Sequence, residues 1–304
     1  ISNIKTTDIY GLSGTPIENS LEDLFNVMEI IKPGLLGAKW QFQDEHQLLT
    51  TSAPGKAVFS GSKNVSGLIE KLKDHLYVCM VETKPVNTVE NIVEVIPDTT
   101  QRTISNDFWK SAKDLQAKAL TAENPGKLKL MVQAMLLRAR QAACDVNLTQ
   151  EIKITSSNKT NAILGQINVF VKNNEQVCVY SQWTSYLEIL SSQVTVPYSY
   201  FHGGLSVKQR SAEIEKFVTG KTKIFFCSDA GQTGIDGLQK ASSNIIHCEP
   251  SWNPAVVKQR TGRLNRIGQT IEVKSYIFIS KGTIDEHVLN LSRTKQQIST
   301  DVLG

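Results

Sequence analysis

The sequence lacks any apolar run near 18 residues, about the length that a helix needs to cross a membrane, so a transmembrane segment is excluded. It also lacks a C-x-x-C pair. Its five cysteines are an odd number, which favours buried free thiols over disulfides or zinc ligands. We therefore predict no membrane partner and no metal site built from these residues. The 40% hydrophobic and 20% charged content of the 304 residues fits a globular protein of about two domains.

A complete phosphate-binding loop is missing as well. Residues 220–222 read Gly-Lys-Thr, but Glu215 stands where the pattern Gly-x-x-x-x-Gly-Lys-Thr needs its first glycine. The segment also runs from a predicted helix into a predicted strand, which is the reverse of the required order. Residues 285–286 resemble an acidic metal-binding box, but they lie within a predicted helix and not at a strand end. Neither segment therefore predicts a site for a nucleotide or for Mg²⁺.

The charge is unevenly distributed. The net charge is +4, and residues 158–304 carry 16 Lys and Arg against 11 Asp and Glu. Residues 1–157 carry 17 against 18. The basic second half gives mild support to an anionic partner. The chain begins at Ile1 without Met or a signal-peptide pattern, and we expect it to belong to a longer protein.

Residues 158–280 alternate short apolar runs with amphipathic stretches, which predicts a parallel sheet with helices on both faces and hence an α/β fold. Capping boxes at Ser206 and Thr283 start two of the helices. The predicted strands are residues 177–180, 197–201, 223–228, 244–248 and 273–279.

The first half of the sequence has a different pattern, in which helical stretches dominate. Residues 101–148 are mostly helical by composition, with a break near residues 124–126 that predicts a helical hairpin. Residues 9–12 are strand-like, and a capping box at Ser20 starts an amphipathic helix.

Residues 251–271 are the most informative segment. Asn253 and Pro254 predict a helix start, because an amide side chain can cap the helix and proline suits its first turn. Gly268 is predicted to end that helix.

Within the helix, Gln259, Arg263 and Arg266 are spaced to share one face. No Asp or Glu occurs between Glu249 and Glu272, so these cations have no partner nearby in the sequence. Unpaired guanidinium groups match the oxygens of a polyphosphate. The alternative is a solvated basic face.

The segment resembles the last signature motif of helicase superfamily two, in the form used by the Swi/Snf family of DNA-translocating ATPases. That form reads Trp-Asn-Pro and then Gln-x-x-x-Arg-x-x-Arg-Ile-Gly-Gln, as residues 252–254 and 259–269 do here. The resemblance implies that Arg263 and Arg266 reach the γ-phosphate of ATP bound on another lobe, and that Gln259 helps to position it. It also implies a RecA-like second lobe at residues 158–304, after a lobe-one remainder at 1–85 and a helical insertion at 86–157.

Two further segments resemble motifs of the same family. Residues 13–19 resemble the third motif, which implies that Ser13, Gly14 and Thr15 couple nucleotide state to DNA contact. Residues 228–239 resemble the fifth motif, which implies nucleotide contacts by Gly234 and Asp236. The alternative for this loop is a glycine-rich turn with a capping Asp.

Polar residues at predicted strand ends are the expected DNA contacts, since strand ends of this family face DNA and can hold phosphates. The alternative for His202 is a histidine of the core, and the alternative for Trp252 is a hydrophobic anchor. The set comprises Ser181, Gln182, His202, Gly203, Ser228 and Trp252.

These expectations describe the C-terminal part of an ATP-dependent translocase that moves along double-stranded DNA, with a DNA-bound protein as a further partner. Mg²⁺ and the phosphate loop would come from a missing first lobe, so residues 1–304 alone should hydrolyse hardly any ATP. The alternatives are a strand-separating helicase of the same superfamily and a catalytically inactive nucleic-acid-binding module. The expected location is the nucleoid for a bacterial or phage protein and the nucleus for a eukaryotic one.

Overall fold

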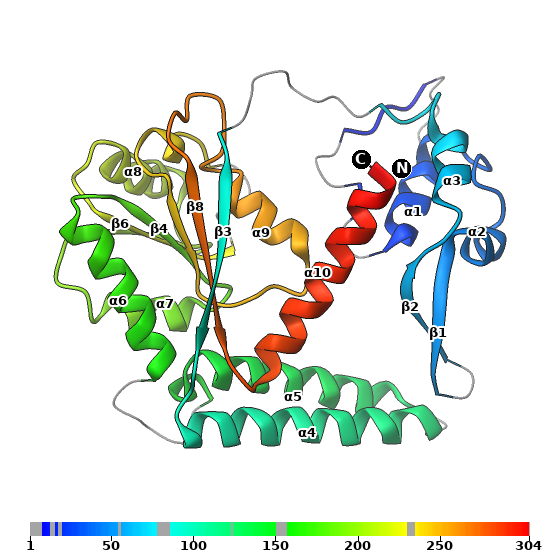
Figure 1. Cartoon of the computed structure of the whole chain (residues 1–304), viewed down its shortest axis with the longest axis horizontal. Coiled ribbons are helices and arrows are strands. Elements are labelled where there is room, and N and C mark those ends of the chain that lie inside the picture. Colours follow the sequence, from blue (N-terminus) through cyan, green and yellow to red (C-terminus); the bar gives the residue numbers. More distant parts are fainter. Residues whose placement is uncertain are drawn as a thin grey trace. The chain divides into compact units, whose positions relative to one another are not determined.

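The computed structural model shows a chain that divides into two compact units (Figure 1). The first comprises Ile1–Glu82, Trp252–Ala255 and Asn290–Gly304, and the second Thr83–Ser251 and Val256–Leu289. The structure describes residues 8–12, 16–17, 20–53, 56–77, 86–122, 124–149, 157–229 and 235–303.

The first unit contains three complete described helices and an antiparallel hairpin, together with the part of α10 (Ile284–Leu303) that begins at Asn290. The predicted capping box starts the first helix, with the Ser20 side chain accepting from the first turn and Asp23 accepting from the Ser20 amide. Apolar side chains of the three helices, including Leu24, Phe42 and Leu68, form a shared buried core. The elements are α1 (Leu21–Ile31), α2 (Lys39–His46), β1 (Gln47–Ala53), β2 (Lys56–Ser62) and α3 (Val65–Leu72).

The strand predicted at residues 9–12 is wrong. These residues have no regular structure, and Tyr10 and Leu12 are exposed. A strand needs a neighbour for its backbone hydrogen bonds. Among the described strands of this unit, β1 and β2 pair with each other, so residues 9–12 have no described strand to join.

The second unit carries the predicted α/β fold, a six-stranded parallel sheet in the order β3-β8-β7-β4-β6-β5. Five of its strands match the five predicted from apolar runs. The strands are β3 (Thr88–Val95), β4 (Val177–Tyr180), β5 (Tyr198–Phe201), β6 (Ile224–Cys227), β7 (Asn244–His247) and β8 (Val273–Ser280).

Strand β3 is an addition within the segment expected to be a helical insertion. It pairs with β8 along all eight residues, from Thr88 opposite Val273 to Val95 opposite Ser280. The sheet therefore receives its edge strand from a part of the chain that precedes the other five strands by more than 80 residues.

Helices cover both faces of the sheet because alternate strand residues point to opposite sides. Val177 and Val179 pack with α6 and α7 on one face, and Cys178 and Tyr180 with α8 on the other. The helices are α6 (Asn158–Lys172), α7 (Thr184–Ser191), α8 (Val207–Val218), α9 (Pro254–Thr261) and α10 (Ile284–Leu303).

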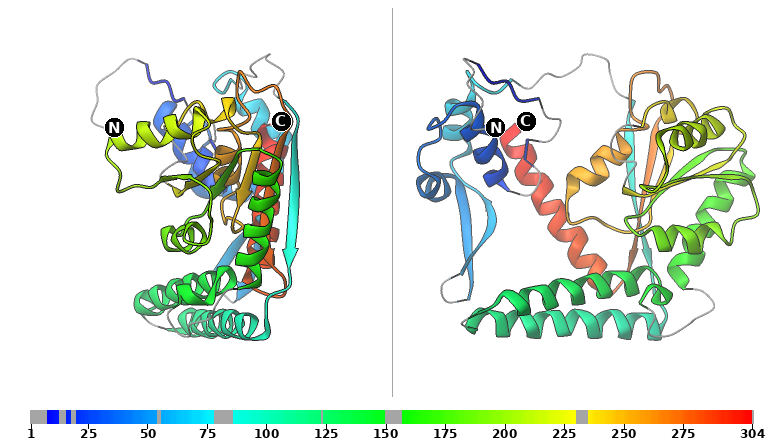
Figure 2. Two further views of the ribbon diagram at one scale, coloured as in Figure 1. Left: turned by 90° about the vertical axis from the view of Figure 1, so that its left-hand side faces the viewer. Right: turned by 180° about the vertical axis from the view of Figure 1, so that it is seen from behind.

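The predicted helical hairpin is formed by α4 (Thr99–Thr121) and α5 (Gly126–Cys144), which lie side by side (Figure 2). Side chains of α4 fasten the end of α5. The Gln101 amide donates to the carbonyls of Ala142 and Ala143 at 3.0 and 3.1 Å, and the Ser105 hydroxyl to that of Ala139 at 3.0 Å. The last carbonyls of a helix need such partners from outside it.

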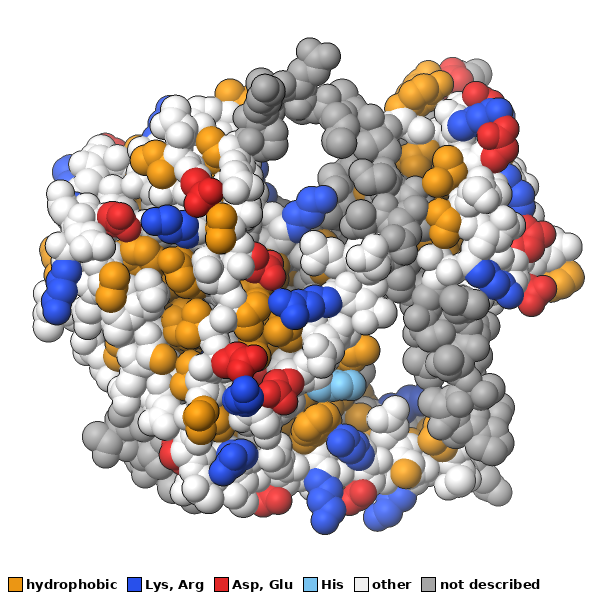
Figure 3. All heavy atoms as spheres, in the orientation of Figure 1, with side chains coloured by type: hydrophobic (Ala, Val, Ile, Leu, Met, Phe, Trp, Pro, Cys, Tyr) orange, Lys and Arg blue, Asp and Glu red, His pale blue; other side chains and the backbone are white. Residues whose placement is uncertain are grey.

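The basic excess of the second half does not mark a site by itself. On the face seen in Figure 3, Lys and Arg side chains are scattered among acidic and apolar ones and do not gather in one patch. No helix in the described ranges combines the length and the apolar character that crossing a bilayer requires.

Candidate functional site

The arginine segment begins as predicted and departs from prediction at its end. The Ala255 amide donates to the Asn253 side chain at 2.9 Å, which caps α9. The helix ends at Thr261, and not at Gly268, and turns follow it. The backbone tightens there, because the amides of Arg263 and Leu264 donate to the carbonyls three residues earlier, at 3.1 and 2.9 Å. The Arg266 Nε then donates at 3.0 Å to the carbonyl of Gly262.

Arg263 and Arg266 converge on one backbone carbonyl. Their Nη1 atoms lie 3.1 and 3.3 Å from the oxygen of Ile235. Arg266 also forms an ion pair with Asp236 at 3.1 Å. The sequence suggested cations without partners, but the partner of Arg266 comes from 30 residues earlier in the chain. Three of the predicted nucleotide-site residues therefore lie together.

The charges of this group influence one another, and two of the three are positive. Burial lowers the pKa of Arg263, and the nearby charge of Arg266 lowers it further, so the two cations repel each other. The hydrogen bond from Gly237 and the contact with Arg266 lower the pKa of Asp236, which keeps it ionised. The Arg266 and Asp236 side chains are 36% and 78% exposed, so a second anion can reach this pair from solvent.

The other predicted nucleotide and coupling residues are placed less fully. Gln259 lies on α9 and is half-buried, and no hydrogen bond joins it to the arginines within the described ranges. Gly234, Ser13, Gly14 and Thr15 lie outside the described residues.

Most of the predicted DNA contacts lie at one edge of the sheet. Ser181 and Gln182 follow β4, His202 and Gly203 follow β5, and Ser228 follows β6. These three strands are adjacent and parallel, with their last residues in register, so the residues that follow them share an edge. The carboxyl edge of a parallel sheet is the usual place for ligands in α/β folds.

The residues at the strand ends differ in how accessible they are to a ligand. Ser181 is fully buried, and its hydroxyl donates to Glu249 at 2.8 Å, so this side chain is engaged internally. Gln182 and His202 are half-buried and Gly203 is exposed, whereas Ser228 is buried.

Trp252 belongs to the first compact unit, unlike the other five predicted DNA contacts. It is half-buried, and its carbonyl accepts a hydrogen bond of 3.0 Å from the Lys295 amine. This contact involves the backbone, so the role of the Trp252 side chain, DNA contact or hydrophobic anchor, stays a prediction.

Two charged residues at the same edge were missed by the sequence analysis. Arg260 was not among the predicted site residues, but it is buried and forms an ion pair with Asp229. Glu249 is also buried and accepts from the Gln182 amide at 2.7 Å as well as from Ser181. The one available signal was a glutamate directly after an apolar strand.

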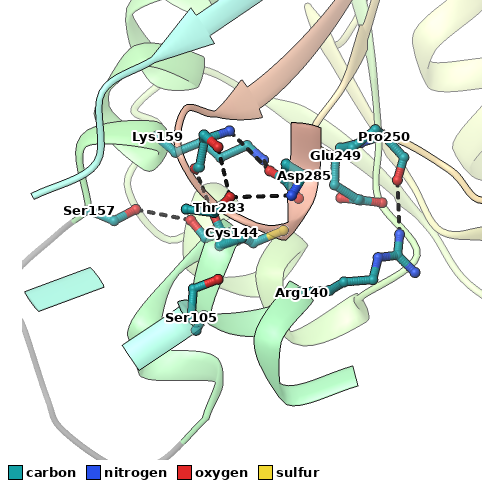
Figure 4. A network of polar contacts seen from close by, with 12 residues as sticks. Ser105, Arg140, Cys144, Ser157, Lys159, Glu249, Pro250, Thr283 and Asp285 are labelled. Carbon is teal, nitrogen blue, oxygen red and sulfur yellow. Dashed lines mark hydrogen bonds and ion pairs between the residues drawn. The ribbon is translucent and has the colours of Figure 1, made fainter. Parts of the chain in front are cut away.

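Asp285 is structural, as expected from its place in a helix. Its carboxylate accepts from the Lys159 amine at 2.7 Å and from the Ser280 amide at 3.0 Å, in a buried network at the base of the hairpin (Figure 4). Nearby, Arg140 donates to the Pro250 carbonyl at 2.9 Å. The described residues hold no group of three side chains that could bind a metal ion.

Comparison with known proteins identifies two family models. The SNF2-related domain matches residues 1–155, and the helicase conserved C-terminal domain matches residues 158–268. An uncharacterised ATP-dependent helicase of Mycoplasma genitalium is 25% identical over 305 residues, covering 97% of this chain and 28% of that protein. The DNA repair protein RAD5A of Arabidopsis thaliana is 34% identical over 152 residues, covering 48% of this chain and 15% of that protein.

The Sulfolobus solfataricus SWI2/SNF2 ATPase core in complex with double-stranded DNA is a structural neighbour, with a TM-score of 0.56 at 24% identity. The match covers 96% of this chain and 63% of that one. At this identity the likeness establishes the fold, that of the RecA-like lobe. The chain spans 28% of the length of the first curated relatives it matches.

Proposed function

The chain belongs to the SNF2-related family, and from this we propose that it is the C-terminal part of an ATP-driven translocase on double-stranded DNA that remodels protein–DNA complexes. The observation that carries the proposal is the convergence of Arg263 and Arg266 beside Asp236. These cations would complete an ATP site whose phosphate loop lies on another lobe.

The existing contacts of the two arginines suit such a role. The ion pair of Arg266 is exposed, and exposed ion pairs contribute little to stability. Exchanging a carbonyl or carboxylate oxygen for a phosphate oxygen therefore costs little. Guanidinium groups stabilise the charge that develops during phosphoryl transfer, and such an arginine contributes about 10³ to 10⁵ in turnover. We assign this role to Arg263 and Arg266, with Gln259 and Asp236 as positioning neighbours.

The described residues supply cations for the far side of an ATP site. Residues 1–304 contain neither a complete phosphate-binding loop nor an acidic box at a predicted strand end, the parts that would hold the phosphates and Mg²⁺. Mg²⁺ would neutralise phosphate charge, and its ligands would belong to the first lobe. We therefore expect residues 1–304 alone to turn over ATP hardly at all.

We assign DNA contact to the carboxyl edge of the sheet. Gln182, His202 and Gly203 are accessible there, and backbone amides at such strand ends can hold phosphates. Ser181 and Ser228 would support these loops from within, since both are buried. Contact with phosphates predicts that DNA affinity falls steeply as salt rises.

The test is ATP turnover by the full-length protein with and without duplex DNA, repeated with Arg263→Ala. DNA should stimulate the wild type, and the variant should lose about 10³-fold or more. Lys258→Ala is the matched control, because Lys258 is an exposed cation on the same segment. Turnover that ignores DNA, or an equal loss in both variants, would contradict the proposal.

Assays on the full-length protein distinguish the proposed translocase from the strand-separating helicase and from the inactive binding module. A strand-separating helicase would release single strands from a duplex, whereas a translocase would displace a triplex-forming strand and leave the duplex intact. An inactive binding module would bind DNA with no turnover at all.

A further inference from the structure

Arg260 joins two groups of residues that the proposed function treats separately. It lies three positions before Arg263, yet its side chain is 2% exposed. Its Nη2 forms an ion pair with Asp229, directly after β6. Its guanidinium carbon lies 5.5 Å from the ring centroid of Tyr180, the last residue of β4. One side chain thus links the arginine segment to the ends of two neighbouring strands.

Glu249 extends this link to a third strand. It follows β7, and its carboxylate holds the Ser181 hydroxyl at 2.8 Å and the Gln182 amide at 2.7 Å. Burial raises the pKa of Glu249, and the positive charge of Arg260 opposes that rise. The charge of Arg260 is therefore felt by the carboxylate that fixes the loop after β4.

Stability does not account for this arrangement. The Nε and Nη1 atoms of Arg260, the hydroxyl of Tyr180 and the Nδ1 atom of His247 are buried without hydrogen-bond partners among the described residues. Unsatisfied buried polar groups cost free energy, because they give up hydrogen bonds to water and gain none in return. A buried cation with open donors thus needs another explanation.

We propose that Arg260 is a positioning residue that couples the nucleotide-contacting arginines to the DNA-contacting strand ends. The proposal rests on the proposed function, which gives these two groups their ligands. Arg260 and Arg263 share a short stretch of backbone, so a shift of Arg263 toward a nucleotide displaces the guanidinium of Arg260. Asp229 and Glu249 then follow the moving charge, and the residues at the strand ends, Ser181, Gln182 and Ser228, change position.

The experiment measures the DNA stimulation ratio of the full-length protein, which is ATP turnover with saturating duplex DNA divided by turnover without it. Asp229→Asn is the first variant, because Asp229 is exposed and its replacement keeps the side-chain shape. We expect basal turnover to be retained and the ratio to fall about fivefold or more, the usual scale of coupling between sites. Asp114→Asn, an exposed change on α4, should leave the ratio unchanged.

Arg260→Lys and Arg260→Met extend the test. Lysine keeps the charge and loses the planar fork, so it should retain part of the ratio, whereas methionine should lose it. If Arg260→Met does not fold, the result for Asp229→Asn still tests whether Arg260 couples the two groups. A fluorescent duplex adds a second readout, because the change in DNA Kd caused by a non-hydrolysable ATP analogue should shrink in Asp229→Asn.

The outcomes separate the two proposals. A wild type that DNA does not stimulate overturns both. A stimulated wild type with an unchanged ratio in Asp229→Asn and Arg260→Lys overturns the coupling role alone. Basal and stimulated turnover that fall by the same factor, together with a lower unfolding midpoint, would mean that Arg260 is merely structural and would also overturn it.

Discussion

Two ion pairs in the second unit use the same chemistry in opposite surroundings. Lys159 and Asp285 are 0% and 1% exposed, whereas Arg266 and Asp236 are 36% and 78% exposed. The first pair ties α6 to α10 beneath the hairpin, and neither charge can reach water. The second can exchange its partner with little loss. Burial therefore separates an ion pair that is shielded from water from one that solvent can reach.

The largest effect should follow from breaking the buried pair. Lys159→Met leaves the Asp285 carboxylate buried and uncompensated, and should cost about 3–5 kcal/mol in unfolding free energy. Urea denaturation measures this loss. Lys281→Met, which breaks an exposed pair with Glu94, is the matched control and should leave the midpoint unchanged. Equal losses in the two variants would remove the distinction based on burial.

The second-largest loss of unfolding free energy should follow from removing the side chain that caps the helical hairpin. Gln101→Ala removes the amide that donates to Ala142 and Ala143. The Ala143 carbonyl keeps the Ser280 hydroxyl at 2.6 Å, but the Ala142 carbonyl loses its donor, at a cost of about 1–3 kcal/mol. The measurement is again the urea midpoint. Gln133→Ala, an exposed change on α5, is the control. A null result for Gln101→Ala would show that the hairpin end does not depend on this side chain.

The pH dependence of stability should report the buried cluster around Arg260. Burial, with the charge of Arg260, holds the pKa of His247 well below its usual 6.5. Below pH 6.5 His247 binds a proton in the unfolded chain but stays neutral in the folded chain. The free energy of unfolding therefore falls as the pH falls. One such group contributes a slope of up to about 1.4 kcal/mol per pH unit. His247→Asn should flatten the curve below pH 6.5, and an unchanged slope would contradict this assignment.

The smallest effect on stability should come from the exposed pair. Asp236→Asn should leave the urea midpoint unchanged, because both partners of this pair are open to solvent. The lowered pKa of Asp236 also keeps the pair intact in mild acid. A loss comparable to that of Lys159→Met would show that the arginine segment is held as firmly as the hairpin base.

The strands of the sheet could be predicted because Val177–Tyr180 and its neighbours are continuous apolar runs, the mark of strands buried on both faces. Strand β3 could not, since Glu90, Asn91 and Glu94 interrupt its apolar residues, as an edge strand permits. An apolar pattern reports burial, and β3 is buried along little of its length.

The candidate site was predictable where the chemistry is local and unpredictable where it is not. Arg263 and Arg266 follow from spacing within one segment. The partner of Arg260 is 31 residues away on another element, so no local pattern indicates it. The helix ends at Thr261, where the backbone bonds of Arg263 and Leu264 shift to carbonyls three residues earlier, and the glycine expected to end it, Gly268, does not reveal this.

The pairing of β3 with β8 has a consequence for synthesis on the ribosome. Residues 88–95 leave the exit tunnel long before 273–280, so the first strand of the sheet waits without its neighbour while some 180 residues follow. Chains emerge at about 5–20 residues per second, which makes this wait last on the order of ten seconds or more. During that interval the charged side chains of the nascent strand, such as Glu90 and Glu94, oppose its pairing with strands of other chains.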